Sequence, residues 1–154
     1  MNKNGSAKQV LLVEDNPGDV RLIELAIQKS NLEIKLCHKS NGEEALDYLL
    51  KWRDSKKPEK IEMIILDLNL PRKDGFEVLQ IIKNDPKIKD IPVLIFTSSE
   101  AESDVKRAFE LNADGYILKG PTLQDFRNSL LQSLTYWLNM EKNENHFDVP
   151  IQAR

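Results

Sequence analysis

Five short apolar runs recur along the chain, and a segment with helical spacing of apolar residues follows each of them. Runs of this length, ended by polar residues, are typical of β-strands. The first, third and fourth runs are almost continuously apolar, which predicts central strands buried on both faces of a sheet. We expect strands over 9–13, 33–37, 61–66, 91–96 and 115–118.

The intervening segments carry residues that begin helices. Pro17 suits a first helical turn, Asn41 is a capping residue, and Thr122 is placed to begin a last helix. The charged segment 53–60 contains a proline and lacks an apolar period, so we expect an exposed loop there. Helices are predicted from Pro17 to about 30, over 42–52, 74–85 and 102–112, and from about 122 to 140.

Alternating strands and helices predict an α/β fold in which helices cover both faces of a parallel sheet through right-handed crossovers. A length of 154 residues suits one domain with one core. We expect this domain over residues 8–140. A short N-terminal tail is expected over 1–7, and a mostly polar, disordered C-terminal tail over 141–154.

Composition narrows the class of protein. The chain is 40% hydrophobic and 31% charged with a formal net charge of −3, which gives no sign of nucleic-acid binding. No apolar stretch is long enough to span a membrane, and the N-terminus lacks an apolar signal core. The single cysteine, Cys37, excludes an intrachain disulfide and a cysteine-rich metal site. These features favour a cytoplasmic location.

Polar residues follow four of the predicted strands. Glu14 and Asp15 come after the first strand, Asp67 after the third, Thr97 after the fourth and Lys119 after the fifth. In open parallel sheets, function gathers beyond the carboxyl ends of the strands, so we expect these side chains at one edge. Repulsion among three carboxylates favours a hard divalent cation such as Mg²⁺. For each acid taken alone, the alternative is a structural role at a helix start.

Such a set of groups indicates phosphoryl transfer. A carboxylate is already an anionic nucleophile at neutral pH, so it needs positioning and charge neutralisation rather than a base. Mg²⁺ and Lys119 would neutralise phosphoryl oxygens. The Thr97 hydroxyl, or backbone N–H groups near it, would hold another oxygen.

The motifs "LLVEDN", "MIILDLNLPRKDG", "LIFTSS" and "YILKG" resemble those of the receiver domains of two-component response regulators, over about residues 8–140. The resemblance implies a flavodoxin-like, doubly wound, five-stranded parallel sheet in the order 2-1-3-4-5, with five helices. It also implies a phosphoacceptor signalling protein, limited to its own phosphorylation and dephosphorylation. The donor would be a sensor histidine kinase or a histidine phosphotransfer protein.

The resemblance also implies roles for single residues. Asp67 would accept the phosphoryl group, and Mg²⁺ would be held by Glu14, Asp15, Asp67 and the backbone carbonyl of Asn69. Lys119 would pair with Asp67.

A conformational switch is implied by the same resemblance. Thr97 would contact the phosphoryl group, and the small Ser98 would permit its access. Thr97 and Tyr116 would move together and reshape the face formed by the fourth helix, the fifth strand and the fifth helix. The alternative for Tyr116 is a half-buried strand aromatic.

A narrower resemblance rests on the long loop 53–60 and the extended last helix. Both features resemble the small stand-alone regulators associated with bacterial phytochromes, which often dimerise. We expect Leu131, Tyr136 and Met140 to join a homodimer or partner surface, with coverage of a large core edge as the alternative. The core stripe of the last helix is expected to contain Leu123, Phe126, Leu130, Leu134, Trp137 and Leu138.

Two other classes of protein stay open. Another Mg²⁺-dependent α/β enzyme is disfavoured, because Asn69 stands where an Asp-x-Asp motif would need its second acid. A binding module that has lost phosphorylation is disfavoured by the intact set of acids, hydroxyl and lysine. The kinase, stimulus, downstream target and phosphoryl lifetime are not indicated by any motif.

One position departs from the family. Receivers usually place proline directly after the lysine, often with a cis bond, whereas here Gly120 follows and Pro121 comes next. We expect a trans Lys119–Gly120 bond, because a cis bond without proline costs about 2.5–4 kcal/mol. Gly120 can also reach backbone angles that other residues avoid.

Overall fold

The structure is a computed structural model that describes residues 7–139. Residues 1–6 and 140–154 lie outside the described part of the chain. The predicted boundaries of the domain and of its two tails therefore stay predictions, and Met140 lies outside the described residues.

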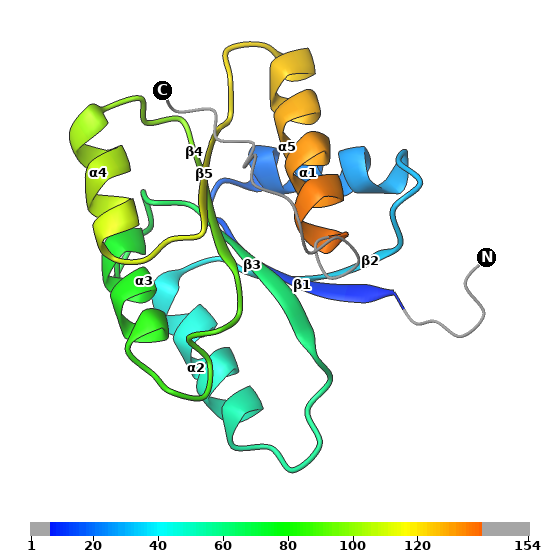
Figure 1. The fold of residues 1–154 in the computed structure, drawn as a ribbon. Coiled ribbons are helices and arrows are strands. Elements are labelled where there is room, and N and C mark those ends of the chain that lie inside the picture. Colours follow the sequence, from blue (N-terminus) through cyan, green and yellow to red (C-terminus); the bar gives the residue numbers. More distant parts are fainter. Residues whose placement is uncertain (1–6, 140–154) are drawn as a thin grey trace.

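A five-stranded parallel sheet forms the centre of the described chain, in the order β2-β1-β3-β4-β5. This order confirms the predicted doubly wound fold. Because the strands are parallel, their carboxyl ends meet at one edge (Figure 1). The strands are β1 (Lys8–Val13), β2 (Ile34–Lys39), β3 (Ile61–Leu66), β4 (Val93–Thr97) and β5 (Gly115–Leu118).

Five helices cover the two faces of this sheet. In Figure 1, α1 and α5 lie on one side, and α2, α3 and α4 lie on the other. They are α1 (Pro17–Gln28), α2 (Gly42–Arg53), α3 (Gly75–Lys83), α4 (Glu102–Glu110) and α5 (Leu123–Leu138).

The apolar runs are continuous because alternate side chains of a central strand pack into two cores, one on each face of the sheet. In β1, Leu11 and Val13 join the core under α2, α3 and α4, while Val10 and Leu12 join the core under α1 and α5. All four side chains are at most 1% exposed. Each such burial stabilises the fold by about 1.5–3 kcal/mol. The central strands therefore hold the residues at their carboxyl ends in fixed positions.

The predicted helix starts are confirmed. Asn41 caps α2 by accepting a hydrogen bond from the backbone N–H of Glu44. Thr122 caps α5 in the same way, and Pro17 is the first residue of α1. A side chain at such a cap satisfies an otherwise unpaired N–H group of the first turn.

Several element ends differ from the prediction by one or two residues. The helix α3 ends at Lys83 rather than 85, because Pro86 disfavours a helical residue directly before it. The strand β4 begins at Val93 rather than 91, because Pro92 has no N–H to donate. The helix α4 ends at Glu110 rather than 112. Beyond its end, Asn112 adopts the left-handed backbone conformation, with φ of 72°.

The core face of α5 differs from the predicted stripe at one end. Leu123 is 69% exposed, so its assignment to the core was wrong. It is the first residue of the helix, beside a groove between α1 and α5 rather than over the sheet. Leu131 and Tyr136 are half-buried, and the Tyr136 ring lies edge-on to Trp137 with centroids 5.6 Å apart.

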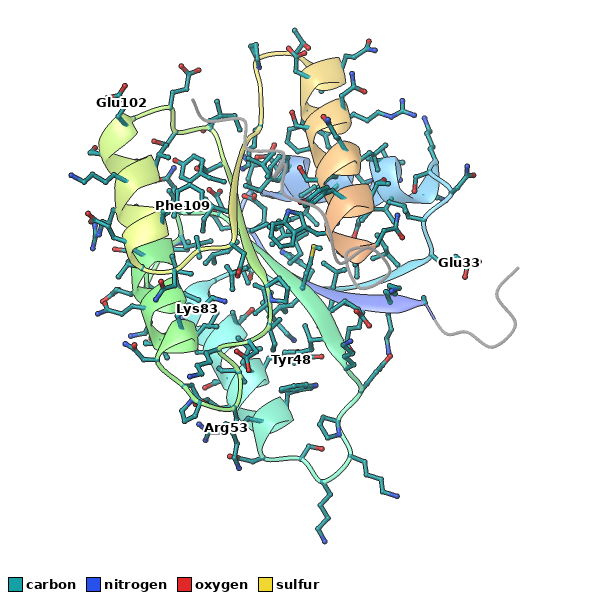
Figure 2. The ribbon with its side chains drawn as sticks, in the orientation of Figure 1. Glu33, Tyr48, Arg53, Lys83, Glu102 and Phe109 are labelled. Carbon is teal, nitrogen blue, oxygen red and sulfur yellow. The ribbon has the colours of Figure 1, made fainter. Side chains whose placement is uncertain are left out.

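A buried lysine joins several segments at the amino edge of the sheet. The side chain of Lys83, labelled in Figure 2, is 8% exposed. Its Nζ donates to the carbonyls of Lys89 and Ile91, at 2.8 and 3.0 Å, and to Asp114 Oδ2, at 2.9 Å. Asp114 Oδ2 also accepts from the backbone N–H of Val93, at 2.8 Å. These contacts attach α3 to the starts of β4 and β5.

A groove of about 460 Å³ opens at the same edge. Trp52 from the end of α2 and Trp137 from the end of α5 both line it. The Trp52 indole N–H donates to the carbonyl of Glu59, in the charged loop after α2. Residues 54–60 of that loop are exposed, as predicted.

Candidate functional site

The carboxyl edge of the sheet gathers the predicted acids. Glu14 and Asp15 follow β1, and Asp67 follows β3. One oxygen from each of these three carboxylates lies within 4.8 Å of the others. Glu14 is 1% exposed and Asp67 is 6% exposed, whereas Asp15 is open to solvent.

Lys119 reaches this cluster from the end of β5. Its side chain is 9% exposed, and its Nζ donates to Glu14 Oε1 at 2.9 Å and to Asp67 Oδ2 at 3.2 Å. A third bond, the shortest, runs to Asp19 Oδ2 at 2.7 Å. The predicted pairing of Lys119 with Asp67 is present, but Lys119 is shared among three carboxylates.

Asp19 is the residue of this edge that sequence reasoning missed. It lies in the first turn of α1, where Asn16 Oδ1 accepts a hydrogen bond from its backbone N–H at 3.0 Å. Asp19 follows the end of β1 by six residues, so the rule that strand ends meet at one edge does not place it there. The available signal was the predicted helix start at Pro17, which places Asp19 in the turn nearest the strand ends.

Burial and charge shift the pKa values of two groups in opposite ways. Burial, and after it the Asp67 carboxylate, raise the pKa of the Glu14 carboxyl to about 7 against the opposing effect of Lys119. Burial by itself would lower the pKa of the Lys119 ammonium. Its bond to Asp19 and the charges of Asp67 and Glu14 outweigh burial and raise that pKa above the ordinary value. Lys119 is therefore cationic at neutral pH.

Thr97 ends β4 and Ser98 follows it, at the same edge of the sheet where Asn69 follows Asp67. Thr97 is fully buried at the end of β4, and its hydroxyl oxygen accepts from the backbone N–H of Ser99 at 3.4 Å. Ser98 is exposed directly after it. Asn69 is also exposed, and its backbone N–H donates to Asp67 Oδ1 at 3.4 Å.

Tyr116 is wholly buried in β5, so the alternative of a half-buried strand aromatic is wrong. Its hydroxyl donates to the backbone carbonyl of Ser99 at 3.0 Å. The Ser99 hydroxyl in turn donates to Asp104 Oδ2 in α4, at 2.6 Å. Tyr116 is thus attached to the loop between β4 and α4, directly beyond Thr97.

The backbone after Lys119 is as predicted. No cis peptide bond occurs within residues 7–139, and Gly120 has φ of 81°. A Cβ at this position would lie 2.6 Å from the Cβ of Asp125. The backbone N–H of Lys119 donates to the carbonyl of Thr97 at 2.9 Å. Gly120 therefore allows the chain to turn away directly after the lysine.

The donor set fits a hard divalent cation. Glu14, Asp15 and Asp67 offer carboxylate oxygens close together, and the ammonium of Lys119 is already shared among Glu14, Asp19 and Asp67. The unbalanced negative charge is costly at this distance. Oxygen ligands of this kind suit Mg²⁺, which binds one or two carboxylates and keeps several waters.

Comparison with known proteins identifies the class. The response regulator receiver domain matches residues 10–131, which are most of the chain. The chain therefore belongs to the receiver-domain family, whose members are signalling modules of two-component systems. The predicted family and its flavodoxin-like fold are both confirmed.

Particular relatives confirm the narrower resemblance to phytochrome-associated regulators. The chain is 34% identical to response regulator Rcp1 of Synechocystis sp. (strain ATCC 27184 / PCC 6803 / Kazusa), over 89% of this chain and 93% of Rcp1. It is 36% identical to the phosphorylated cyanobacterial phytochrome response regulator RcpA, with a TM-score of 0.80, over 88% of this chain and 96% of RcpA. The Mn²⁺-bound form of Rcp1 is also 36% identical, with a TM-score of 0.77, over 85% and 94% of the two chains.

Two further findings concern ligands and membranes. Receiver domains bind a divalent metal ion, and the acidic cluster of this chain is consistent with that property. The site geometry thus agrees with the family in the kind of ion it suits.

Among the helices of residues 7–139, none combines the length and the apolar character needed to cross a membrane.

Proposed function

We propose that this protein is a response regulator that accepts a phosphoryl group on Asp67 and passes the signal on by protein contact. The donor is a sensor histidine kinase, of the phytochrome type, or a histidine phosphotransfer protein. The observation that carries this proposal is the Asp67 carboxylate. It is buried at a strand end, beside two further acids, and it bonds the Lys119 ammonium at 3.2 Å.

The transfer needs little from the protein beyond placement. An Asp67 oxygen attacks phosphorus, the phosphorus–nitrogen bond of the donor's phosphohistidine breaks, and the imidazole nitrogen keeps the electron pair. Mg²⁺, held by Glu14, Asp15, Asp67 and the Asn69 carbonyl, would neutralise negative charge on the carboxylates and on the phosphoryl oxygens.

Lys119 supplies the positive charge that belongs to the chain itself. Its Nζ already donates a hydrogen bond to Asp67 Oδ2, so it is positioned to donate to a phosphoryl oxygen attached to Asp67. The exposed Ser98 is small and leaves room for the donor to approach. Hydrolysis of the resulting acyl phosphate returns the protein to its resting state, and we expect no other enzymatic chemistry.

The signal would leave through the face formed by α4, β5 and α5. Thr97 contacts the phosphoryl group and draws the loop after β4 toward it. Tyr116 responds because its hydroxyl is bonded to Ser99 in that loop, at 3.0 Å. A local charge at Asp67 thereby biases a two-state element.

A homodimer or partner surface is proposed on the last helix. Leu131 and Tyr136 are half-buried there, and Met140 is the third residue of the predicted surface. If Tyr136→Ala and Met140→Ala leave both the solution mass and the response to the kinase unchanged, this surface is wrong. We also propose a cytoplasmic location, since the kinase domains that act on such proteins work there.

The function is tested by treating the purified protein with acetyl phosphate and Mg²⁺. We expect one alkali-labile phosphoryl group per chain, detected by intact mass, that is absent from Asp67→Asn and from samples with a chelator. Asp47→Asn, on the exposed side of α2, is the matched control for the change in charge. No adduct from any donor would instead favour a binding module, and turnover of an unrelated phosphoester would favour an enzyme.

A further inference from the structure

Lys119 has used its full capacity for hydrogen bonds in this structure. An ammonium group has three N–H donors, and Lys119 directs them to Glu14, Asp19 and Asp67. The bond to Asp19, at 2.7 Å, is shorter than the bond to Asp67, at 3.2 Å. The lysine is therefore bound more closely to α1 than to the proposed phosphoacceptor.

Asp19 differs from the other two acceptors in its origin. Glu14 and Asp67 belong to the cluster of acids directly after the strands, whereas Asp19 projects from the first turn of a helix. The Asn16 cap fixes that turn, and Val20 and Ile23 bury the helix in the core. The Asp19 side chain is 23% exposed and that of Lys119 is 9% exposed, so Asp19 is the more open to solvent of the two.

This arrangement has a consequence for any anion that arrives at Asp67. Lys119 can donate to a new phosphoryl oxygen only by releasing an acceptor it now holds. Asp19 is the acceptor outside the metal-binding set, and its own charge opposes the approach of an anionic donor.

We propose that Asp19 is a positioning residue that competes with Asp67 for the Lys119 ammonium and thereby restrains phosphoryl acceptance. The inference rests on the proposed function of Asp67. It assigns to the first turn of α1 a part in setting how readily the protein is phosphorylated.

The first test is Asp19→Asn, which removes the charge but keeps an oxygen that can accept from Lys119. Its backbone N–H can still bond Asn16, so the helix start is retained. We expect the rate of Asp67 phosphorylation by acetyl phosphate to rise about threefold to tenfold at low ionic strength, and the gain to shrink at high salt. Asp19→Glu keeps the charge and should stay near the wild-type rate. Asp47→Asn, with the same change in net charge, is the control.

The second test measures the contact without phosphorylation. In metal-free protein labelled with ¹⁵N-lysine, a buried and hydrogen-bonded ammonium exchanges its protons slowly and gives a resolved NMR signal. We expect this signal of Lys119, assigned by its loss in Lys119→Met, to shift and exchange faster in Asp19→Asn and to stay unchanged in Asp47→Asn. An unchanged signal in Asp19→Asn would contradict the contact.

The outcomes separate the two proposals. If wild-type protein forms the Asp67 adduct but Asp19→Asn reacts no faster than Asp47→Asn, the restraint by Asp19 is wrong and the proposed function stands. If Asp19→Asn reacts more slowly, Asp19 aids acceptance and the proposal is likewise overturned. If wild-type protein forms no adduct that Asp67→Asn abolishes, the proposed function itself fails.

Discussion

Two buried lysines lie at opposite edges of the sheet, and their partners differ in kind. Lys83, at the amino edge, bonds two backbone carbonyls and one carboxylate. Lys119, at the carboxyl edge, bonds three carboxylates, and a fourth, Asp15, lies beside them. Their side chains are 8% and 9% exposed, so burial alone does not distinguish them.

The difference lies in the balance of charge. At Lys83 one ammonium meets one carboxylate and neutral carbonyls, so the site is complete without any further group. At Lys119 the acids outnumber the cation, and the remaining negative charge is relieved by protonation of Glu14, whose pKa is raised to about 7, or by another cation. A balanced buried lysine is a structural contact, whereas an outnumbered one marks an edge that is built to receive a ligand.

The largest effect is expected for Lys83→Met. This change leaves Asp114 and two carbonyls near the α3–β4 loop without their shared donor. We expect the free energy of unfolding in urea to fall by about 3 kcal/mol. Mg²⁺ should restore none of it, and the protein that remains folded should still be phosphorylated on Asp67. Recovery by Mg²⁺ would contradict the structural role.

The matched change Lys119→Met should behave in the opposite way toward Mg²⁺. Without metal, Glu14, Asp19 and Asp67 lose the ammonium that they share, and we expect a loss of about 2 kcal/mol in unfolding free energy. With Mg²⁺, most of that loss should be recovered and the protein should fold. Phosphorylation should then fail to move the Thr97–Tyr116 switch, as measured by amide chemical shifts in α4, β5 and α5. A variant that switches normally would overturn the role of Lys119.

A smaller effect is expected for Glu14→Gln in chelator, and it depends on pH. The folded pKa of Glu14, about 7, is above its ordinary value of 4.5. Its contribution to stability is therefore full below about pH 4.5 and is lost as the pH rises through 7. Glutamine has no such loss, so the stability of the variant relative to the wild type should rise between about pH 4.5 and pH 7 and stay level above that. Urea titrations across this range measure it, and a difference independent of pH would contradict it.

The smallest effect concerns Tyr116→Phe, which touches neither lysine. It removes one hydrogen bond, to the Ser99 carbonyl, and keeps the buried ring. We expect stability to fall by about 1 kcal/mol or less. Adduct formation at Asp67 should be unchanged, while the shifts in α4 on phosphorylation should weaken. A reduced rate of adduct formation would show that the hydroxyl also acts at the acid edge.

The strand-end residues of the site could be predicted because topology alone brings them together. Glu14, Asp67 and Lys119 each follow a strand, and a parallel sheet places all carboxyl ends at one edge. Their predicted chemical roles await the experiments above. The strand order needed the family resemblance, because apolar runs do not reveal which strands are neighbours.

Other features depend on three-dimensional packing. Asp19 reaches the site from a helix, and its direction depends on how α1 lies on the core. Leu123 has helical spacing with the core residues of α5 but lies beyond the sheet, where periodicity predicts burial wrongly. Gly120 was predictable in part, since its backbone freedom is a local property.

The amino-edge groove has a practical consequence for optical experiments. The chain contains two tryptophans, and both line that groove, at the other edge of the sheet from Asp67. Intrinsic fluorescence is therefore a poor direct reporter of metal or phosphoryl binding at the acidic edge. Any change in tryptophan emission on phosphorylation would instead register a disturbance carried across the whole sheet. The two tryptophans therefore report structural change transmitted from the acidic edge to the amino edge, rather than the binding of a ligand at the acidic edge.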